Sequence, residues 1–469
     1  MFSILDKEFI IDKVIYFCLN YIFKNHILII IKFFFKSLVL ISAIYIMLES
    51  KKNLVILLNQ TNFYKTNNII KLAIYSHSLN NGGVERNTAI LLNYISTIEL
   101  FEIYLFTDII SNNEYKISNK IKRVIISYKS NYLKRQLLKN KINILIYQFY
   151  DKPIIEMLKK IRNLKIILYN HSCFLFWIYT KDRFIFKNVY NEYKKSNYVI
   201  SIVPFENDFL FKKWGIKSIF MDNFLTYDYN KVIKSDLSSN NILMIGRGSD
   251  ENKRFYLGIR AMKYILKEIQ KSQMIVISDD KDIKYIKKIV KFLNLEKNIN
   301  FVGYSATPEI YFKNASLHIF PTIAEACPMV LSETKIYGIP NILVGIDYVS
   351  NIKGGVVIVY DDDPEIIAKY AIKILTNEQY KKTLSKEARK SMKKFNNNIL
   401  FKKWVELLMA VNNEDTYNFY FNKNKLSENE SLYILKNQIN LLRKRIPSLE
   451  NINIKDILNF SFIENINYI

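Results

Sequence analysis

Cysteine, glycine and proline are all scarce in this sequence. The 469 residues include 3 Cys, 11 Gly and 8 Pro. Cys18, Cys173 and Cys327 are odd in number and far apart, so their spacing gives no disulfide framework and no cysteine metal cluster. A reducing compartment fits this cysteine usage best. The few Gly and Pro, beside abundant Lys, Asn and Ile, are typical of an AT-rich genome.

The sequence also lacks the motifs of nucleic-acid-binding proteins, although it is strongly basic. Its formal net charge is +25, from 68 Lys+Arg against 43 Asp+Glu. Such a charge favours polyanions, which include nucleotides, phosphorylated substrates, anionic lipid and nucleic acid. No zinc-finger spacing, RNP-like motif or Arg-rich arm accompanies the charge, so we predict no nucleic-acid partner. Most of the lysines are interpreted as solvated surface residues.

Apolar content is high enough for large cores. Hydrophobic residues make up 50% of the chain and aromatic residues 14%. This composition disfavours disorder over most of the length, and the length predicts two or three domains.

The N-terminal residues 10–48 are unusually apolar. They are too long for a secretory signal and lack a clear A-x-A cleavage site. Ile27–Leu48 is long enough to span a bilayer, but Lys32 and Lys36 interrupt it. A tilted transmembrane helix and a helix in the membrane interface remain open, beside a soluble helical cap. We favour membrane contact through residues 1–60, with the body of the protein in the cytoplasm.

From residue 70 onward, short β-rich runs alternate with amphipathic stretches, in two series separated by a polar connector at 221–239. Near-continuous apolar strands alternating with helices predict parallel sheets covered on both faces. The predicted strands are 71–76, 102–107, 123–127, 143–148, 165–170 and 198–202, then 241–246, 273–278, 299–303, 317–321, 340–344 and 355–360. The fold class is therefore α/β, with two tandem doubly wound Rossmann-like domains after an apolar helical N-terminal segment.

The domain boundaries follow from this pattern. The expected units are an N-terminal Rossmann-like domain at 70–228, a C-terminal one at 240–395, a closing helix at 396–411 and a C-terminal extension at 412–469. The extension has an amphipathic run at 431–446, for which the sequence indicates no chemistry. In doubly wound folds, ligands bind at the carboxyl ends of the strands, so the sequence predicts a cleft between the two domains.

The stretch EACPMVLSE holds two carboxylates on either side of a predicted helix start. Pro328 suits the first turn of a helix, and Gly338 suits its end. The free N–H groups at the start of this helix would form an anion site in the cleft. Glu325 precedes the helix and Glu333 lies within it. By spacing alone, a first-turn glutamate and a surface glutamate are the better interpretation.

Two further loops favour an anionic ligand. Gly246 and Arg247 end the strand at 241–246, and Lys253 follows, which suits a diphosphate. In the first domain, Gly82 and Gly83 lie at a strand-to-helix turn and allow close backbone approach to a ligand. This turn is not G-x-G-x-x-G, which disfavours dinucleotide binding.

At these residues the sequence resembles the retaining glycosyltransferases of the GT-B fold, family 4 or group 1. The similarity covers residues 70–411 and is strongest over 241–376, in the segments IGR…K, INFVGY, IFPTIAEACPMVLSETKIYGIP and GGVVIVYDDDPEIIA. It implies transfer of a sugar from a nucleotide-diphosphate sugar to a glycan or lipid-linked acceptor, with retention of configuration, as in polysaccharide biosynthesis. A catalytically degenerate module that binds nucleotide and serves as a scaffold is the alternative.

The resemblance implies a role for each matching residue. Glu325 would lie at the donor sugar, and Glu333 would bind the ribose hydroxyls. Arg247 and Lys253 would bind the diphosphate. His171 would face the transferred sugar, with a satisfied loop histidine as an equal alternative. Further donor contacts are implied for Gly82, Gly83, Pro328, Met329, Val330, Gly303 and Tyr304.

The resemblance implies no metal or other cofactor for the chemistry. Asp361, Asp362 and Asp363 follow a predicted strand and precede Pro364, where an acidic run could hold Mg²⁺. Helix N-capping is the favoured interpretation of this run.

Overall fold

The computed structural model describes residues 69–446, apart from gaps at 81, 150, 180–188, 190–191, 213, 248–250, 280–282 and 415–426. The apolar segment at 10–48 and its expected membrane contact lie outside the described residues. Among the helices of the described part, none combines the length and the apolar character needed to cross a bilayer.

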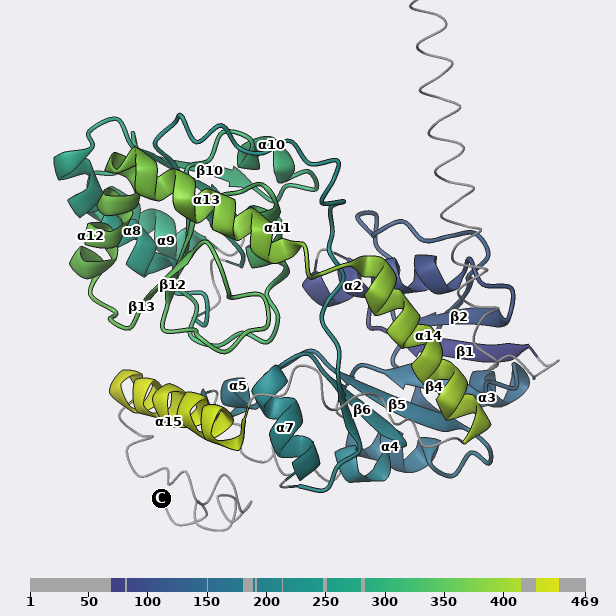
Figure 1. The fold of residues 1–469 in the computed structure, drawn as a ribbon. Helices are drawn as coiled ribbons and strands as arrows, with labels where there is room; N and C mark the ends of the chain where they lie inside the picture. Colours follow the sequence, from purple (N-terminus) through teal and green to yellow (C-terminus); the bar gives the residue numbers. More distant parts are fainter. Residues whose placement is uncertain are drawn as a thin grey trace, which may run out of the picture. The chain divides into compact units, whose positions relative to one another are not determined.

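The first sheet has seven parallel strands in the order β3-β2-β1-β4-β5-β6-β7 (Figure 1). The central strand β1 pairs with β2 on one side and with β4 on the other, so that Leu72 lies opposite Ile103 and Ile144. The strands are β1 (Ile70–Tyr75), β2 (Phe101–Thr107), β3 (Lys122–Ile125), β4 (Ile144–Tyr147), β5 (Lys165–Asn170), β6 (Tyr198–Ser201) and β7 (Ser218–Phe220). The helices are α2 (Gly83–Ile95), α3 (Ser130–Lys139), α4 (Lys152–Leu158), α5 (Phe174–Tyr179) and α7 (Pro204–Lys212).

The second sheet has six parallel strands in the order β10-β9-β8-β11-β12-β13. Its strands are β8 (Asn241–Ile245), β9 (Gln273–Ile277), β10 (Ile299–Gly303), β11 (Leu317–Phe320), β12 (Asn341–Val344) and β13 (Val356–Val359). Its helices are α8 (Phe255–Glu268), α9 (Lys284–Phe292), α10 (Glu309–Phe312), α11 (Met329–Ile336), α12 (Pro364–Thr376) and α13 (Glu378–Met392).

The apolar runs in the sequence explain both sheets. Ile144–Tyr147 and Leu317–Phe320 are buried at every position, as expected for parallel strands covered on both faces. All twelve predicted strands are present, which confirms the predicted α/β fold class with two Rossmann-like sheets. The sequence prediction missed β7, because three residues are too few to show a period.

The chain returns to the first sheet through α14 (Asn397–Asn413), as Figure 1 shows. Phe401 of α14 packs on Tyr94 of α2 with ring centroids 5.1 Å apart, and Trp404 packs on Tyr169 of β5 at 5.2 Å. The connector from β7 to β8 is fixed to the start of α14, because Asn397 accepts a hydrogen bond from Leu225 N (2.7 Å) and donates one to Leu225 O (3.0 Å).

The acidic run before α12 forms a helix cap. Asp363 is the N-cap residue of α12 and accepts a hydrogen bond from Glu365 N at 2.8 Å. Asp361 accepts from Asp363 N at 2.9 Å, and Asp362 pairs with Arg254 and Arg445. The capping prediction is therefore confirmed for Asp363.

Asn caps helices as well as Asp does, but its neutral amide binds Mg²⁺ more weakly than a carboxylate does. We expect Asp363→Asn to match the wild-type protein in urea unfolding and in activity, with or without EDTA. Asp363→Ala should lose about 1 kcal/mol of unfolding free energy, because the N–H of Glu365 loses its acceptor. Loss of activity in Asp363→Asn would instead support a metal ligand.

Candidate active site

The turn from β11 to α11 is formed as the sequence predicts, with a shift of one residue. Pro328 is the N-cap residue, with φ −67° and ψ 114°, so the helix begins at Met329 and not at the proline. Gly338 follows the helix in the left-handed region, with φ +73°. A residue without a Cβ adopts this conformation without strain, so glycine ends the helix here.

The N-termini of α11 and α2 lie against each other. A Cβ built on Gly83 would lie 3.6 Å from Met329 Sδ. The N-cap residues, Gly82 and Pro328, make no side-chain capping hydrogen bond. At the start of α2 the carboxylate of Glu85 accepts from its own backbone N–H, so the first turn of α11 is the one that offers N–H groups without a side-chain cap, and such a turn favours an anion.

Glu333 of α11 is buried and held by two side chains from outside its own helix. Arg86 of α2 forms an ion pair with Glu333 Oε1, and Thr226 Oγ1 donates to the same oxygen at 2.7 Å. Burial opposes the positive charge of Arg86, but the attraction of Glu333 and Tyr115 outweighs it and raises the pKa of Arg86. The carboxylate is therefore fixed in place, with its charge compensated.

Lys253 and Glu325 form a second ion pair at the same edge of the second sheet. Glu325 Oε1 also accepts from Thr322 Oγ1 at 2.9 Å, and Glu325 N donates to Tyr348 Oη at 3.0 Å. Lys253 Nζ lies 5.4 Å from the centre of the Phe320 ring. A cation and a carboxylate thus come together at the carboxyl end of β11, from loops 72 residues apart.

Two buried residues next to Lys253 fix both of these loops. Asn252 Nδ2 donates to Ala324 O and its Oδ1 accepts from Ala324 N, both at 2.9 Å. Arg254 has a left-handed backbone, with φ +46°, and its Nε donates to Pro321 O at 2.7 Å. The direction of Lys253 is therefore set by its two sequence neighbours.

Arg247 follows β8 and is exposed. Burial raises the pKa of Glu85 on α2, and the positive charge of Arg247 counteracts that rise. Arg247 is therefore close enough to the start of α2 to act on it electrostatically, from the opposite sheet.

His171 lies just after β5, at the carboxyl edge of the first sheet. Its Nε2 is 2.6 Å from Gln148 Oε1, which also accepts from Thr88 Oγ1 at 3.1 Å. Burial lowers the pKa of His171 to about 3, so the imidazole is neutral at physiological pH. Because Gln148 Oε1 can only accept, His171 carries its proton on Nε2.

Gly303 ends β10 and Tyr304 follows it. Gly303 has φ +73°, and Tyr304 is 41% exposed. Tyr304 also contributes to the raised pKa of Tyr115, after burial and in opposition to Arg86. This places Tyr304 near the group around Arg86 and Glu333.

A buried polar chain joins the His171 loop to the Glu325 loop. Glu206 of α7 accepts from Asn170 Nδ2 at 2.6 Å and from Phe174 N at 2.9 Å. Cys173 lies close enough to Glu206 and to Tyr348 to interact with both electrostatically, and Tyr348 Oη is the group that accepts from Glu325 N. Burial raises the pKa of Glu206 to about 8.

This raised pKa has a consequence for stability. Folded Glu206 keeps its proton up to about pH 8, whereas in the unfolded chain it ionises near pH 4.5. Its stabilising contribution is complete below pH 4.5 and is lost as the pH rises through 8. We expect Glu206→Gln to remove this loss, on the order of a few kcal/mol, in urea unfolding at pH 5 and pH 8. The exposed Glu99→Gln is the control, and equal pH slopes in wild type and Glu206→Gln would contradict the prediction.

The structure brings most of the candidate residues together, and it adds partners that the sequence did not reveal. Lys253 pairs with Glu325, and Gly83 lies against Met329 at the start of the helix that carries Glu333. The residues missed were Arg86, Thr226, Tyr348 and Gln148. Of these, only Arg86 could have been noticed in the sequence. A cation near a helix N-terminus is unfavourable with respect to the helix dipole, which indicates that an acidic partner compensates its charge.

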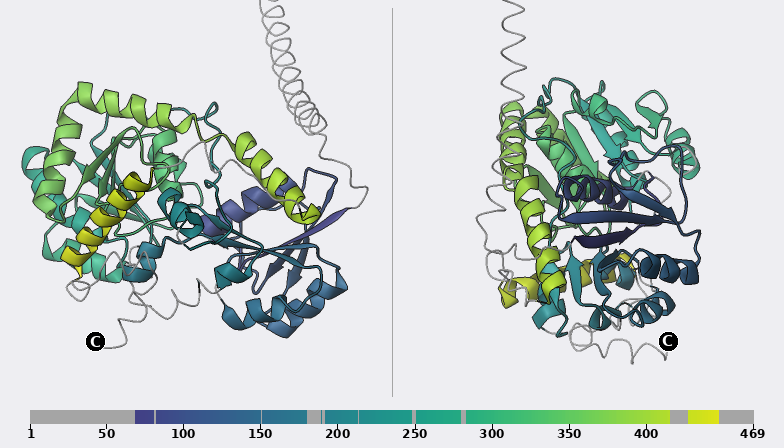
Figure 2. Two further views of the ribbon diagram at one scale, coloured as in Figure 1. Left: turned by 60° about the horizontal axis from the view of Figure 1, so that its bottom comes forward. Right: turned by 90° about the vertical axis from the view of Figure 1, so that its right-hand side faces the viewer.

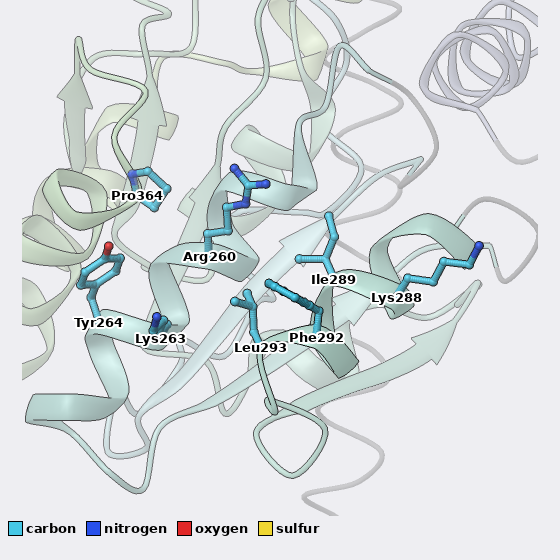
Figure 3. Close-up of a pocket in the computed structure, with 8 residues that line it drawn as sticks. All are labelled: Arg260, Lys263, Tyr264, Lys288, Ile289, Phe292, Leu293 and Pro364. Atoms are coloured by element: carbon cyan, nitrogen blue, oxygen red, sulfur yellow. The ribbon is translucent and has the colours of Figure 1, made fainter.

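A cavity of about 570 Å³ lies elsewhere on the second sheet, between α8 and α9 (Figure 3). Arg260, Lys263, Lys288 and Phe292 contribute to its lining. The lining contains no carboxylate and no histidine, and it includes none of the candidate site residues. It therefore has no carboxylate to accept from ribose hydroxyls.

Comparison with known proteins gives a family model, a protein of similar sequence and several solved structures of similar fold. Residues 228–391 match the model described as glycosyl transferases group 1. The GalNAc-alpha-(1->4)-GalNAc-alpha-(1->3)-diNAcBac-PP-undecaprenol alpha-1,4-N-acetyl-D-galactosaminyltransferase of Campylobacter jejuni is 20% identical over 372 residues, which cover 74% of this chain and 100% of that protein.

Solved structures are similar in fold. Sucrose-phosphate synthase from Thermosynechococcus elongatus has a TM-score of 0.61 at 14% identity, covering 72% of this chain and 98% of that one. HepE from Anabaena, in complex with UDP-glucose, has a TM-score of 0.56 at 11% identity, covering 73% and 100%. These similarities confirm the GT-B fold.

Proposed function

We propose that the protein transfers a sugar from a nucleotide-diphosphate sugar with retention of configuration. The premise is that the similarities above support a group 1 glycosyltransferase. The proposed acceptor is a glycan or a lipid-linked glycan. The observation that supports the proposal most strongly is the group formed by the paired N-termini of α2 and α11 with Lys253, Glu325, Arg86 and Glu333. Its anion-binding N–H groups and its carboxylates match the two parts of such a donor, a diphosphate and its flanking hydroxyls.

The proposed roles follow from the charges. Lys253, Arg247 and the N–H groups of Met329 and Val330 bind the diphosphate, with Gly82, Gly83 and Pro328 allowing close approach. Donor binding exchanges the Lys253–Glu325 pair for a Lys253–phosphate contact, which releases Glu325 to accept from sugar hydroxyls. Glu333 accepts from the ribose hydroxyls, and Gly303 and Tyr304 border the base.

The proposed reaction occurs on one face of the sugar. The bond from the anomeric carbon to the phosphate oxygen breaks, and the acceptor oxygen bonds to the same carbon from the same side. The acceptor proton moves to the leaving phosphate oxygen, so no separate protein base is required. The protein stabilises the charge that grows on the diphosphate, and preorganised cations in a desolvated cleft do this most effectively. Neutral His171 donates its Nε2 proton to Gln148, so its Nδ1 is free to accept a hydrogen bond from a hydroxyl of the transferred sugar.

The relatives suggest a class of donor and of acceptor. The Campylobacter relative is named for transfer to an undecaprenol-diphosphate-linked glycan, and the Anabaena neighbour holds UDP-glucose. We therefore propose a UDP-sugar donor and a lipid-linked acceptor at the cytoplasmic face of a membrane, with contact through residues 10–48. No metal takes part in the proposed chemistry. The scaffold alternative is not favoured, because Glu325, Glu333, Arg247 and Lys253 are all retained, whereas a degenerate module would be expected to have lost some of them.

The experiment that tests the proposal is a transfer assay with a panel of UDP-sugars and lipid-linked or free glycan acceptors. We expect one donor to give a product whose anomeric configuration, read by NMR coupling constants, matches the donor. An inverted product would contradict the retaining mechanism. Nucleotide binding without transfer to any acceptor would favour the scaffold.

A further inference from the structure

The C-terminal amphipathic run forms helix α15 (Glu428–Arg445), which packs at the same edge of the second sheet as the candidate site. Figure 2 shows it in yellow, and it also packs on α7 of the first sheet. Gln438 is 2% exposed, and its Nε2 donates to Gly345 O at 2.9 Å and to Asp347 Oδ1 at 2.7 Å. Gly345 directly follows β12, so α15 binds the carboxyl end of that strand.

The last residue of α15 makes the strongest of these contacts. Arg445 donates from Nε to Asp362 Oδ2 at 2.9 Å and from Nη2 to Asp362 Oδ1 at 2.8 Å, a bidentate pair. Its side chain is 7% exposed. A Cβ on Gly345 would lie 2.5 Å from Arg445 Nη2, so the guanidinium lies directly on the backbone.

Asp362 also contacts Arg254, a residue next to the candidate site. Its Oδ2 also lies 2.7 Å from Nη1 of Arg254, which is 3% exposed. Arg254 donates to Pro321 O at 2.7 Å and to Thr322 O at 3.4 Å. Lys253 precedes Arg254 in the chain, and Thr322 donates to Glu325. One continuous set of contacts thus runs from α15 to both members of the Lys253–Glu325 pair.

We propose that α15 is a positioning element of the donor site, in which Arg445 and Gln438 fix the loops that carry Lys253 and Glu325. The inference rests on the proposed function, in which Lys253 binds the diphosphate. A cation can be preorganised for that role only if the loop that carries it is fixed. The network also bridges to the first sheet, because Ser431 of α15 lies 3.4 Å from Asp208 of α7. Arg445 is a positioning residue, not a catalytic one.

The test compares Arg445→Ala with Lys444→Ala, which removes the same charge from an exposed position of the same helix. Amide hydrogen exchange of residues 251–254 and 321–327 measures the local stability of the two loops in the absence of any ligand. We expect exchange at least 10-fold faster in Arg445→Ala, and UDP bound about 10-fold more weakly in isothermal titration. Arg445→Lys should restore only part of both effects, because lysine cannot make the bidentate contact. Gln438→Leu gives a second, milder variant.

A double variant tests whether Arg445 acts through Lys253. Arg445→Ala should cost much less in UDP affinity in a Lys253→Ala background than in the wild-type background. Additive losses would overturn the proposed route, and exchange equal to that of Lys444→Ala would overturn the positioning role itself. If wild-type protein binds no UDP, the proposed donor fails, while hydrogen exchange still decides the role of α15.

Discussion

Lys253→Ala is expected to turn over about 10²- to 10³-fold more slowly than the wild-type protein, with a smaller change in KM for the donor. Lys253 lies at the carboxyl edge of the second sheet, half-buried and beside Glu325. A cation fixed in this way contributes most when negative charge grows on the leaving diphosphate, and it requires no reorganisation at that moment. Steady-state kinetics with the donor varied at saturating acceptor measures both constants.

Lys263→Ala is the matched control for Lys253→Ala. It removes the same charge from an exposed position on α8, and we expect turnover within about 2-fold of wild type. Far-UV circular dichroism and urea unfolding establish that both variants are folded. Near-wild-type turnover in Lys253→Ala would contradict the proposed diphosphate site.

Glu333→Ala is expected to lower the free energy of unfolding by about 3 kcal/mol and to abolish measurable nucleotide binding. The stability loss arises because Arg86 keeps its charge in a largely buried position without a carboxylate partner. The binding loss arises because a carboxylate that accepts from two ribose hydroxyls contributes about 1.5–3 kcal/mol per hydrogen bond. Urea unfolding and titration with UDP measure the two effects.

A double variant separates the two effects of Glu333. Arg86→Ala with Glu333→Ala should be more stable than Glu333→Ala alone, because the uncompensated charge is gone. It should still bind no nucleotide. Recovery of binding in the double variant would mean that Glu333 serves to neutralise Arg86 and does not contact the ligand. Equal stability of the single and double variants would mean that the unpaired charge of Arg86 does not lower the free energy of unfolding.

The sequence predicted the strands well because their signal is local. Ile144–Tyr147 and Leu317–Phe320 are short, wholly apolar runs, and a run of this kind in an alternating α/β pattern has few other interpretations. Strand β7, with Ser218 and Phe220 at its ends, has too few residues for the same argument. Helix α11 was displaced by one residue, since Pro328 serves equally well as an N-cap and at the first helical position.

The contacts of the candidate site could not be predicted, because they join distant parts of the chain. Lys253 pairs with Glu325 across 72 residues, and Arg86 pairs with Glu333 across 247. Spacing such as E-x7-E places both carboxylates relative to one helix but gives no information about which side chains hold them. The positions of these loops after strands indicated a shared anionic ligand, and only the family resemblance indicated which ligand it would be.

The C-terminal helix shows a further limit. Its amphipathic period predicted a buried face, which the structure confirms with Leu435, Ile439 and Leu442. The period could not identify the surface that covers this face. The functional groups of the helix, Gln438 and Arg445, are polar residues within or beside that face, where an apolar pattern gives no sign of a role.

The central claim, a nucleotide-diphosphate site at the start of α11, is tested most directly by thermal shift with UDP, GDP, ADP and CMP. Wild type and Glu333→Ala are each compared with the same protein without ligand. One diphosphate at about 100 times its Kd should stabilise the wild type by roughly 2.7 kcal/mol and should leave Glu333→Ala unchanged. Absence of any shift in the wild type, or an equal shift in Glu333→Ala, would contradict the claim.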